Sequence, residues 1–293
     1  MDFSAIGKKV KELRKSIGLS QAELAEGICT QAQISKIENG DVIPLASTLY
    51  LLAQRLGLSV DYFFDISLSP RLDYVHEVSE QLKLARKRVN YALIKEIVEA
   101  EENNPLFTAN KYHHQLLIWH KAIYCYHLYR NFELAVQLIE DAIAMTFEKV
   151  PSEREIEIYF SKGIFFAEEK RHKEALEIYQ EADRRLKNLL YLKDTTIRSR
   201  ISFNLAKSLT NLEEYEKSIN TCHFAIKECL QNDDFYLLGD LNYQIGFNYE
   251  LQKECQKAII FYEKAFFICT MQGSPFIQIV TDKIKKLKSQ ILS

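Results

Sequence analysis

Residues that break helices are scarce in this sequence, and so are long apolar runs. There are 9 glycines and 5 prolines among 293 residues, too few for a turn-rich β protein or a disordered chain. No apolar run approaches the ~18 residues that a membrane-spanning helix needs. The N-terminus has an early acid and no long apolar core, so we expect no signal peptide. These absences predict a cytoplasmic protein without a membrane partner.

The 6 cysteines form no recognisable framework. They contain no CxxC pair and no spacing typical of a disulfide scaffold. Reduced, partly buried thiols are the expected state in the cytoplasm. A redox-sensing pair formed by Cys222 and Cys229, on one predicted helix, is the alternative.

Enzymatic motifs are missing as well. The sequence contains no HExxH helix, glycine-rich phosphate loop or nucleophile elbow. His113, His120 and His127 raise the idea of a metal site, but helical residues with this spacing lie about 10.5 Å apart, too far to share one ion. We therefore expect no catalytic activity, no metal and no other cofactor.

Helical periodicity dominates the sequence. With 47% apolar and 27% charged residues, the chain is long enough to form two domains. From Arg71 onward the periodicity is nearly continuous, and strand-like alternation is absent. Pro70 disfavours helix just before it. We predict an all-α protein with a first domain at 1–66, a linker at 67–72 and a second domain at 73–293.

The stretch from Leu19 to Gly40 predicts two short helices with a tight turn between them. Ser20 and Glu23 have the spacing of a capping box. Thr30 can cap the second helix, and the Asn39-Gly40 pair suits its C-terminus. This pattern is typical of a helix-turn-helix, whose second helix enters the major groove of DNA.

Helices are expected on both sides of this motif. An upstream helix ends near Gly18, and downstream helices are expected from Pro44 to Gly57 and from Ser59 to Phe64. With SQAELA and ISKIENG in register, the segment Phe3–Asp65 resembles the Cro/C1-type DNA-binding domain. The resemblance implies a domain of five helices.

The resemblance also implies roles for individual residues. Gln21 would touch the phosphate backbone and brace the second motif helix, whereas Arg14 and Glu38 would pair inside the domain. Near the start of the second helix, Gln can pair with adenine, Lys with guanine, and Ala can pack on a thymine methyl. The implied DNA-contacting residues are Gln21, Thr30, Gln31, Ala32, Gln33, Ser35, Lys36 and Asn39. A solvated Lys36 without a DNA contact is the alternative.

Charge does not favour DNA binding by a single copy of this domain. Residues 1–65 contain seven Lys or Arg against eight Asp or Glu, and duplex binding draws much of its affinity from phosphate neutralisation. The basic residues cluster locally, from Lys8 to Lys15, with Lys36 on the second motif helix. We therefore expect a homodimer that binds two half-sites.

A second pattern repeats along residues 73–293. Four helices carry a small residue, an apolar or aromatic residue four later and Ala seven later, as at Ala175, Tyr179 and Ala182. Three of them have another small residue twelve before the start: Gly163, Ala206 and Gly246. This spacing resembles the tetratricopeptide repeat, in which small residues let paired helices approach closely.

The repeats are longer than usual. Counting a weaker first copy, they start at 93, 135, 175, 218 and 258, so 40 to 43 residues separate them, against a usual period of about 34. Ser274-Pro275 opens a last amphipathic helix. We predict a right-handed α-solenoid of about five degenerate repeats, closed by a C-terminal capping helix.

The concave wall of such a solenoid is lined mainly by the first helix of each pair. Aromatic, amide and cationic side chains are expected there, a mixture that suits an extended peptide. Amides can pair with the peptide backbone, while aromatic rings form side-chain pockets. The candidate peptide contacts are Phe160, Ile164, Arg200, Phe203, Asn204, Lys207, Tyr243, Gln244 and Phe247. Ordinary core packing is the alternative for each aromatic residue.

The two domains together resemble the PlcR-like family of peptide-responsive quorum-sensing regulators of Gram-positive bacteria. FNLAKSL (203–209) followed by EEYEKSI (213–219) is similar to one repeat of that family, where an Asn at the position of Asn204 holds the peptide backbone. The NYQIG segment likewise falls on a peptide-facing stretch. The family has further Asn residues where this chain has Phe160 and Ile164, so a different peptide with fewer backbone hydrogen bonds is expected.

The resemblance implies a homodimeric transcription regulator. Its partners would be double-stranded DNA with two half-sites and a short signalling peptide, and the peptide would control operator binding through the linker near Pro70. Two alternatives remain open. The repeats could dock a protein partner while DNA binding is constitutive, or they could serve only dimerisation.

Overall fold

The computed structural model describes residues 4–63, 72–146, 148 and 150–292. Within these residues all regular secondary structure is helical, which confirms the predicted all-α class. The chain forms two compact units, residues 1–117 and 118–293. None of the described helices combines the length and apolarity that crossing a membrane requires. The described helices of the first unit include α1 (Ser4–Ile17), α2 (Gln21–Ala25), α3 (Gln31–Asn39), α4 (Ala46–Arg55), α6 (Leu72–Lys87), α7 (Tyr91–Glu101) and α8 (Pro105–Thr108).

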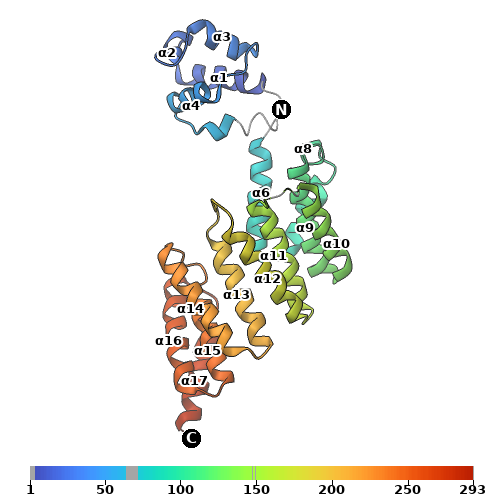
Figure 1. Cartoon of the computed structure of the whole chain (residues 1–293), viewed down its shortest axis with the longest axis vertical. Coiled ribbons are helices and arrows are strands. Elements are labelled where there is room, and N and C mark those ends of the chain that lie inside the picture. The colour runs from blue at the N-terminus through green and yellow to red at the C-terminus, as the bar shows by residue number, and fades with distance from the viewer. Residues whose placement is uncertain (1–3, 64–71, 147, 149, 293) are drawn as a thin grey trace. The chain divides into compact units, whose positions relative to one another are not determined.

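Helix α9 (Lys111–Tyr129) runs from the first unit into the second. The remaining helices alternate in direction along the chain (Figure 1). They are α10 (Phe132–Thr146), α11 (Glu153–Glu168), α12 (His172–Lys187), α13 (Thr196–Asn211), α14 (Tyr215–Gln231), α15 (Leu238–Leu251), α16 (Cys255–Gln272) and α17 (Ile277–Leu292).

The helix boundaries around the DNA-binding motif follow from local chemistry. The hydroxyl of Ser20 accepts from the Glu23 N–H, and the Glu23 carboxylate accepts from the Ser20 N–H, so the predicted capping box is present. Thr30 caps α3, accepting from the Gln33 N–H. Gly40 ends α3 in the left-handed conformation, with a φ of 81°, where glycine carries no steric penalty.

One expectation for the first domain needs adjustment. The fourth helix begins at Ala46 rather than at Pro44, because the N-cap residue Leu45 is still extended. Residues 60–63 are helical after Ser59, whose hydroxyl accepts from the Asp61 N–H. The end of this predicted fifth helix and nearly all of the predicted linker lie outside the described residues.

Five helix pairs follow in sequence: α6 and α7, α9 and α10, α11 and α12, α13 and α14, α15 and α16. The turn inside each pair contains one non-glycine residue with positive φ, at 89, 130, 170, 213 and 253. These turns recur at the predicted spacing of 40 to 43 residues. The predicted repeat architecture is confirmed, and Pro105 opens an extra short helix, α8, between the first two pairs.

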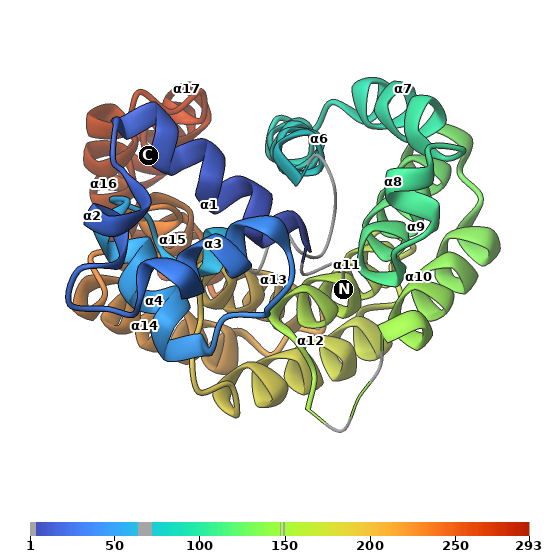
Figure 2. The same ribbon diagram turned by 90° about the horizontal axis from the view of Figure 1, so that it is seen from above.

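The small residues of the repeat pattern are packing positions. Gly163 on α11 faces the ring of Tyr179 on α12, and a Cβ there would overlap that ring. Gly246 on α15 faces Tyr262 on α16 in the same way, where a Cβ would lie 2.8 Å from Cδ1. Within the second unit, α11, α13 and α15 lie on the inner side of the curve, and α12 and α14 lie on the outer side (Figure 2).

Candidate DNA-binding and ligand-binding sites

Helix α3 presents the predicted DNA-reading face to solvent. Ile34 and Ile37 anchor the helix, because both are fully buried in the core of the domain. The exposed members of the predicted set are Thr30, Gln31, Ala32, Lys36 and Asn39, and the half-buried ones are Gln21, Gln33 and Ser35. This arrangement leaves polar side chains free to reach base edges, as direct readout requires.

A buried ion pair holds α3 to α1. Arg14 Nε donates to Glu38 Oε1 at 2.6 Å, and Arg14 Nη2 donates to Oε2 at 2.9 Å. Gln21 Nε2, from α2, donates to Oε2 of the same carboxylate at 2.9 Å. Burial alone would raise the pKa of Glu38, but the hydrogen bonds from Arg14 and Gln21 outweigh it and hold the pKa below its usual value.

This geometry confirms the predicted pairing of Arg14 with Glu38. It also shows how Gln21 braces the motif, since its side chain ties α2 to the last turn of α3. The phosphate contact expected of Gln21 stays a prediction.

The histidines raised as metal-ligand candidates have other contacts. His113 Nδ1 lies 2.8 Å from the carbonyl oxygen of Leu106. His127 packs edge-on against Tyr126 and Phe165, and burial lowers its pKa to about 4. Among the described residues, no three His, Cys, Asp or Glu side chains are arranged to hold a metal ion.

The two cysteines considered as a redox pair are buried in α14. Burial raises the pKa of Cys222 to about 12 and that of Cys229 to about 11. Because the thiolate is the reactive form, these thiols are protonated and protected. The structure therefore favours a packing role.

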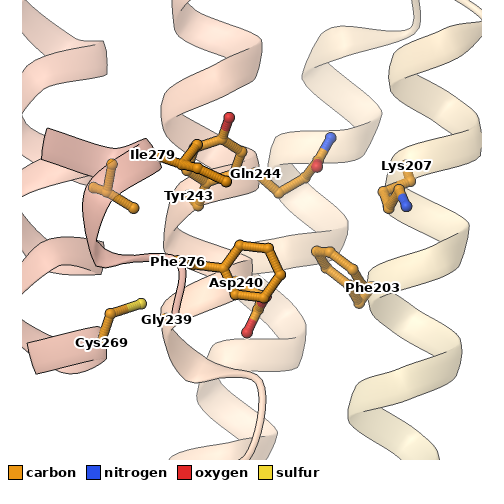
Figure 3. A pocket seen from close by; sticks show the side chains of 10 residues that line it. Phe203, Lys207, Gly239, Asp240, Tyr243, Gln244, Cys269, Phe276 and Ile279 are labelled. Atoms are coloured by element: carbon orange, nitrogen blue, oxygen red, sulfur yellow. The ribbon is translucent and has the colours of Figure 1, made fainter. Parts of the chain in front are cut away.

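A pocket of about 280 Å³ opens among α13, α15, α16 and α17 (Figure 3). Four of the predicted peptide contacts line it: Phe203 and Lys207 from α13, and Tyr243 and Gln244 from α15. The structure thus brings together residues separated by 40 positions in the sequence. Phe203 and Tyr243 are half-buried, so both rings can contact a ligand.

Six further residues line the same pocket and were missed from the sequence. They are Gly239, Asp240, Cys269, Phe276, Ile279 and Val280. Phe276 and Ile279 are about half exposed, at 51% and 49%. The segment that was expected only to cap the solenoid therefore supplies one wall of the pocket.

Gln244, which lines the pocket from α15, belongs to a buried polar network. Its Nε2 donates to Thr210 Oγ1 at 2.7 Å, and Asn248 Nδ2 donates to Ser218 Oγ at 2.9 Å. Thr210 Oγ1 and Asn248 Oδ1 lie 2.8 Å apart. Because Gln244 is only 4% exposed, its first role is to join α15 to α13.

Three other predicted contacts lie on the same inner helices. Asn204 Nδ2 donates to the Arg200 carbonyl, which leaves the Asn204 side-chain oxygen available as an acceptor. Arg200 donates to Glu157 on α11 at 2.7 Å. Phe247 stacks parallel to Tyr243, with 6.4 Å between the ring centroids, and lies beneath the ammonium of Lys283.

Phe160 and Ile164 on α11 pack into a hydrophobic cluster with α12. The Phe160 ring is 6% exposed, with its centroid 5.5 Å from that of Tyr179. This is the packing alternative considered for the aromatic residues. We leave Phe160 out of the proposed peptide surface for this reason, and keep Ile164 because it is half-buried.

Comparison with known families accounts for most of the chain. Residues 10–63 match a helix-turn-helix family, and residues 79–288 match the RNPP family C-terminal domain. The chain belongs to the RNPP family. The predicted resemblance to PlcR-like regulators is thereby confirmed.

Solved structures with the RNPP arrangement match nearly the whole chain. PlcR of Bacillus thuringiensis, solved with the peptide PapR7 and DNA, is 21% identical with a TM-score of 0.84, over 97% of this chain and 99% of that one. ComR of S. thermophilus, solved with DNA and its signalling peptide ComS, is 15% identical with a TM-score of 0.58, and 98% of each chain is covered. At these identities the likeness shows the fold.

A curated relative matches only the DNA-binding motif. It is an uncharacterised helix-turn-helix transcriptional regulator of Rickettsia conorii, 41% identical over 63 residues. The match covers 21% of this chain and spans half the length of that relative. This relative therefore supports the helix-turn-helix assignment alone.

Proposed function

We propose that this protein is a DNA-binding transcription regulator whose repeat domain binds a short signalling peptide. One observation carries the proposal. A helix-turn-helix with an exposed reading helix is joined, in one chain, to an RNPP C-terminal domain with an open pocket among its repeat helices. PlcR and ComR, which share this fold, were both solved with a peptide and DNA.

DNA recognition is assigned to α3. Lys36 and Gln31 are exposed; the Lys36 ammonium can donate to base edges in the major groove, and the Gln31 amide can both donate and accept. Because the domain has no net positive charge to offer the phosphates, one copy binds weakly, and a homodimer on two half-sites supplies the missing affinity. The domain boundary is proposed at residue 66, with residues 67–72 as the connection.

The repeat domain has a surface that suits the homodimer. Ile260, Phe267 and Met271 on α16 are 52%, 66% and 74% exposed, and their spacing places them along one helix face. Exposed apolar stripes of this kind are typical of protein interfaces. Sedimentation of the full chain and of Met271→Glu tests the assignment, since loss of the dimer is expected in the variant.

Peptide binding is assigned to the inner helices around the pocket. The Asn204 side-chain oxygen can accept from a peptide N–H, while Phe203 and Tyr243 contact peptide side chains. A peptide that binds one conformation of the repeats more tightly shifts the population toward it, and so changes the half-site geometry that the dimer fits. No residue of either site has a catalytic role in this proposal.

The test is binding of purified full-length protein to sheared genomic DNA from its own organism, with and without a short-peptide extract of dense culture supernatant. The proposal expects extract to tighten or redirect DNA binding, and Asn204→Ala to abolish the response. Binding that ignores every extract would favour repeats that dock a protein partner or serve only dimerisation. Absence of DNA binding at low salt would contradict the DNA-binding assignment.

A further inference from the structure

The pocket among α13, α15, α16 and α17 combines apolar walls with the carboxylate of Asp240. Phe203, Tyr243, Phe276 and Ile279 supply the apolar walls, and the Asp240 carboxylate is seen below the Phe276 ring in Figure 3. Asp240 belongs to the first turn of α15. A ligand in this pocket therefore meets aromatic rings and a single carboxylate.

Asp240 is half-buried, and no described side chain forms a hydrogen bond or an ion pair with its carboxylate. The groups that favour the charged form of its carboxylate are its own backbone N–H and the ammonium of Lys207. Burial raises the pKa of Asp240 above its ordinary value, and that N–H and the charge of Lys207 only partly oppose the rise. A ligand that donates a hydrogen bond to a desolvated acceptor of this kind stabilises the complex.

The dimensions of the pocket limit what can enter it. Its volume of about 280 Å³ is just below the usual range for ligand pockets, roughly 300–1,000 Å³. One large side chain of a peptide fits that space, and the ring-lined walls favour an aromatic one.

The charges of Lys207 and Asp240 determine which peptide side chains suit the pocket. Lys207 is exposed at the pocket, with its ammonium 5.5 Å from the centroid of the Phe203 ring. Its positive charge opposes a further cation in the pocket, and so favours a neutral hydrogen-bond donor over Lys and Arg. Asp240 in turn disfavours Asp and Glu, and Phe would leave the carboxylate without a donor.

We propose that this pocket receives a tyrosine or tryptophan side chain of the signalling peptide, and that Asp240 accepts the hydrogen bond from its phenol O–H or indole N–H. The inference rests on the peptide-binding function proposed above and adds the side-chain chemistry that the site selects. It makes Asp240 a specificity-determining residue.

The experiment is a selection of random heptapeptides on immobilised full-length protein. Wild type is compared with Asp240→Ala, which removes the acceptor, and with Asp240→Asn, which keeps the volume. Asp282→Asn is the matched control, because Asp282 is an exposed acid on α17 that does not line the pocket. Thermal melting of each variant establishes that it is folded.

Wild type and the Asp282→Asn control should enrich Tyr or Trp at one peptide position. In a synthetic peptide from that selection, replacing Tyr by Phe should weaken binding about tenfold, the order expected for a hydrogen bond to a charged group. Asp240→Ala should bind the Tyr and Phe peptides equally. Asp240→Asn, a weaker acceptor, should show an intermediate ratio.

The possible failures are distinguishable. Selected peptides that bind wild type but show no Tyr or Trp preference would overturn this inference and leave peptide binding intact. A preference that persists in Asp240→Ala would overturn the role of Asp240. If no peptide binds any of the proteins, both this inference and the proposed peptide-binding function are wrong.

Discussion

The DNA-binding domain and the repeat domain build their functional surfaces in opposite ways. In the first, one short helix carries nearly all the candidate contacts, and a buried ion pair, Arg14 with Glu38, holds that helix in place. In the second, helices α13, α15, α16 and α17 each contribute to one pocket. Neutral hydrogen bonds between Gln244, Thr210 and Asn248 join two of its walls.

This difference has an energetic consequence. A buried charge that loses its partner is far more costly than a neutral group that loses a hydrogen bond. The DNA-binding domain therefore depends on one interaction, whereas the repeat domain distributes its stability over many small contacts. Its helix pairs meet only their neighbours, as in other repeat proteins.

Breaking the ion pair between Arg14 and Glu38 should have the largest effect on stability. Arg14→Ala leaves the Glu38 carboxylate buried without its main partner, and we expect a loss of about 3–5 kcal/mol in the free energy of unfolding. Hydrogen exchange read by mass spectrometry should show faster exchange in α1–α4 alone. Lys9→Ala is the control on the same helix, because Lys9 belongs to a more exposed pair with Glu12 and should cost under about 1 kcal/mol. Equal effects of the two variants would refute the dependence on a single pair.

Adding one methyl group at a close helix contact should be the next most damaging change. A Cβ at Gly7 would overlap the backbone carbonyl oxygen of Ile37, which cannot move without shifting α3. At Gly246 the neighbours are the Tyr262 ring and a carbonyl 3.2 Å away. Alanine improves helix propensity by about 1 kcal/mol, but the overlap outweighs this gain. We expect Gly7→Ala to lower the free energy of unfolding by about 2 kcal/mol, and Gly246→Ala to lower it by less. Urea unfolding followed by hydrogen exchange measures both, and the reverse order would contradict the contacts described.

Truncating an exposed residue of α3 should affect binding without affecting folding. Lys36→Ala should weaken operator binding by about 1–3 kcal/mol and relax the preference at one base pair. Lys173→Ala removes a lysine of the repeat domain that is also exposed and serves as the control. Fluorescence anisotropy on a selected duplex at fixed salt provides the comparison. An unchanged affinity and preference in Lys36→Ala would mean that this side chain is merely solvated.

The two domains should also differ in their response to acid. Burial lowers the pKa of His127 to about 4 in the folded repeat domain. In the unfolded chain this histidine is protonated near pH 6.5, whereas in the folded domain it stays neutral until the pH nears 4. The resulting stability is present above pH 6.5 and is lost as the pH falls toward 4, by about 2 kcal/mol. Glu38 also has a lowered pKa, but its contribution is lost only as the pH falls below about 4.5.

The fluorescence of the single tryptophan reports the pH-dependent stability of the repeat domain. Trp119 is buried in the second unit, where its indole N–H donates to Ser161. Its fluorescence in urea should show a smaller loss of stability between pH 6.5 and 4.5 for His127→Gln than for wild type. Identical pH profiles would show that His127 is not the responsible group.

The smallest expected effect is the modification of the buried cysteines by a thiol reagent in the native protein. Cys222 and Cys229 are buried with raised pKa values, so a thiol reagent should modify them only after unfolding. Cys255 is half-buried and should react earlier in the native protein. Peptide mapping after brief labelling provides the readout, and early modification of Cys222 would restore the redox alternative.

The sequence predicts these two regions unequally, for a physical reason. Helix caps and apolar spacing are local, so Ser20, Thr30 and Gly40 are enough to locate the ends of the DNA-binding helices. The repeat spacing likewise predicts which small residues face aromatic rings. Pocket residues such as Asp240 and Phe276 carry no such signal, because they meet only when successive repeats stack.

Counting residues along a helix also predicts which way a side chain points, but it does not predict whether a neighbouring helix covers that side chain. Phe160 lies on an inner helix as predicted, but the neighbouring helix covers its ring through Tyr179. Gln244 reaches the pocket wall and yet uses its amide to bond Thr210. Whether an inner-facing side chain meets a ligand or a neighbour depends on packing between repeats, which a single sequence does not encode locally.

The central claim is that peptide binding in the repeats controls DNA binding by the first domain. The most direct measurement is the affinity of the full-length protein for a duplex selected from random DNA, at fixed salt, with and without a peptide selected on the same protein. We predict that the peptide changes the affinity at least several-fold, and that Asn204→Ala abolishes the change while binding the duplex alone as wild type does. Equal affinity with and without saturating peptide, on duplexes of every half-site spacing, would contradict the account.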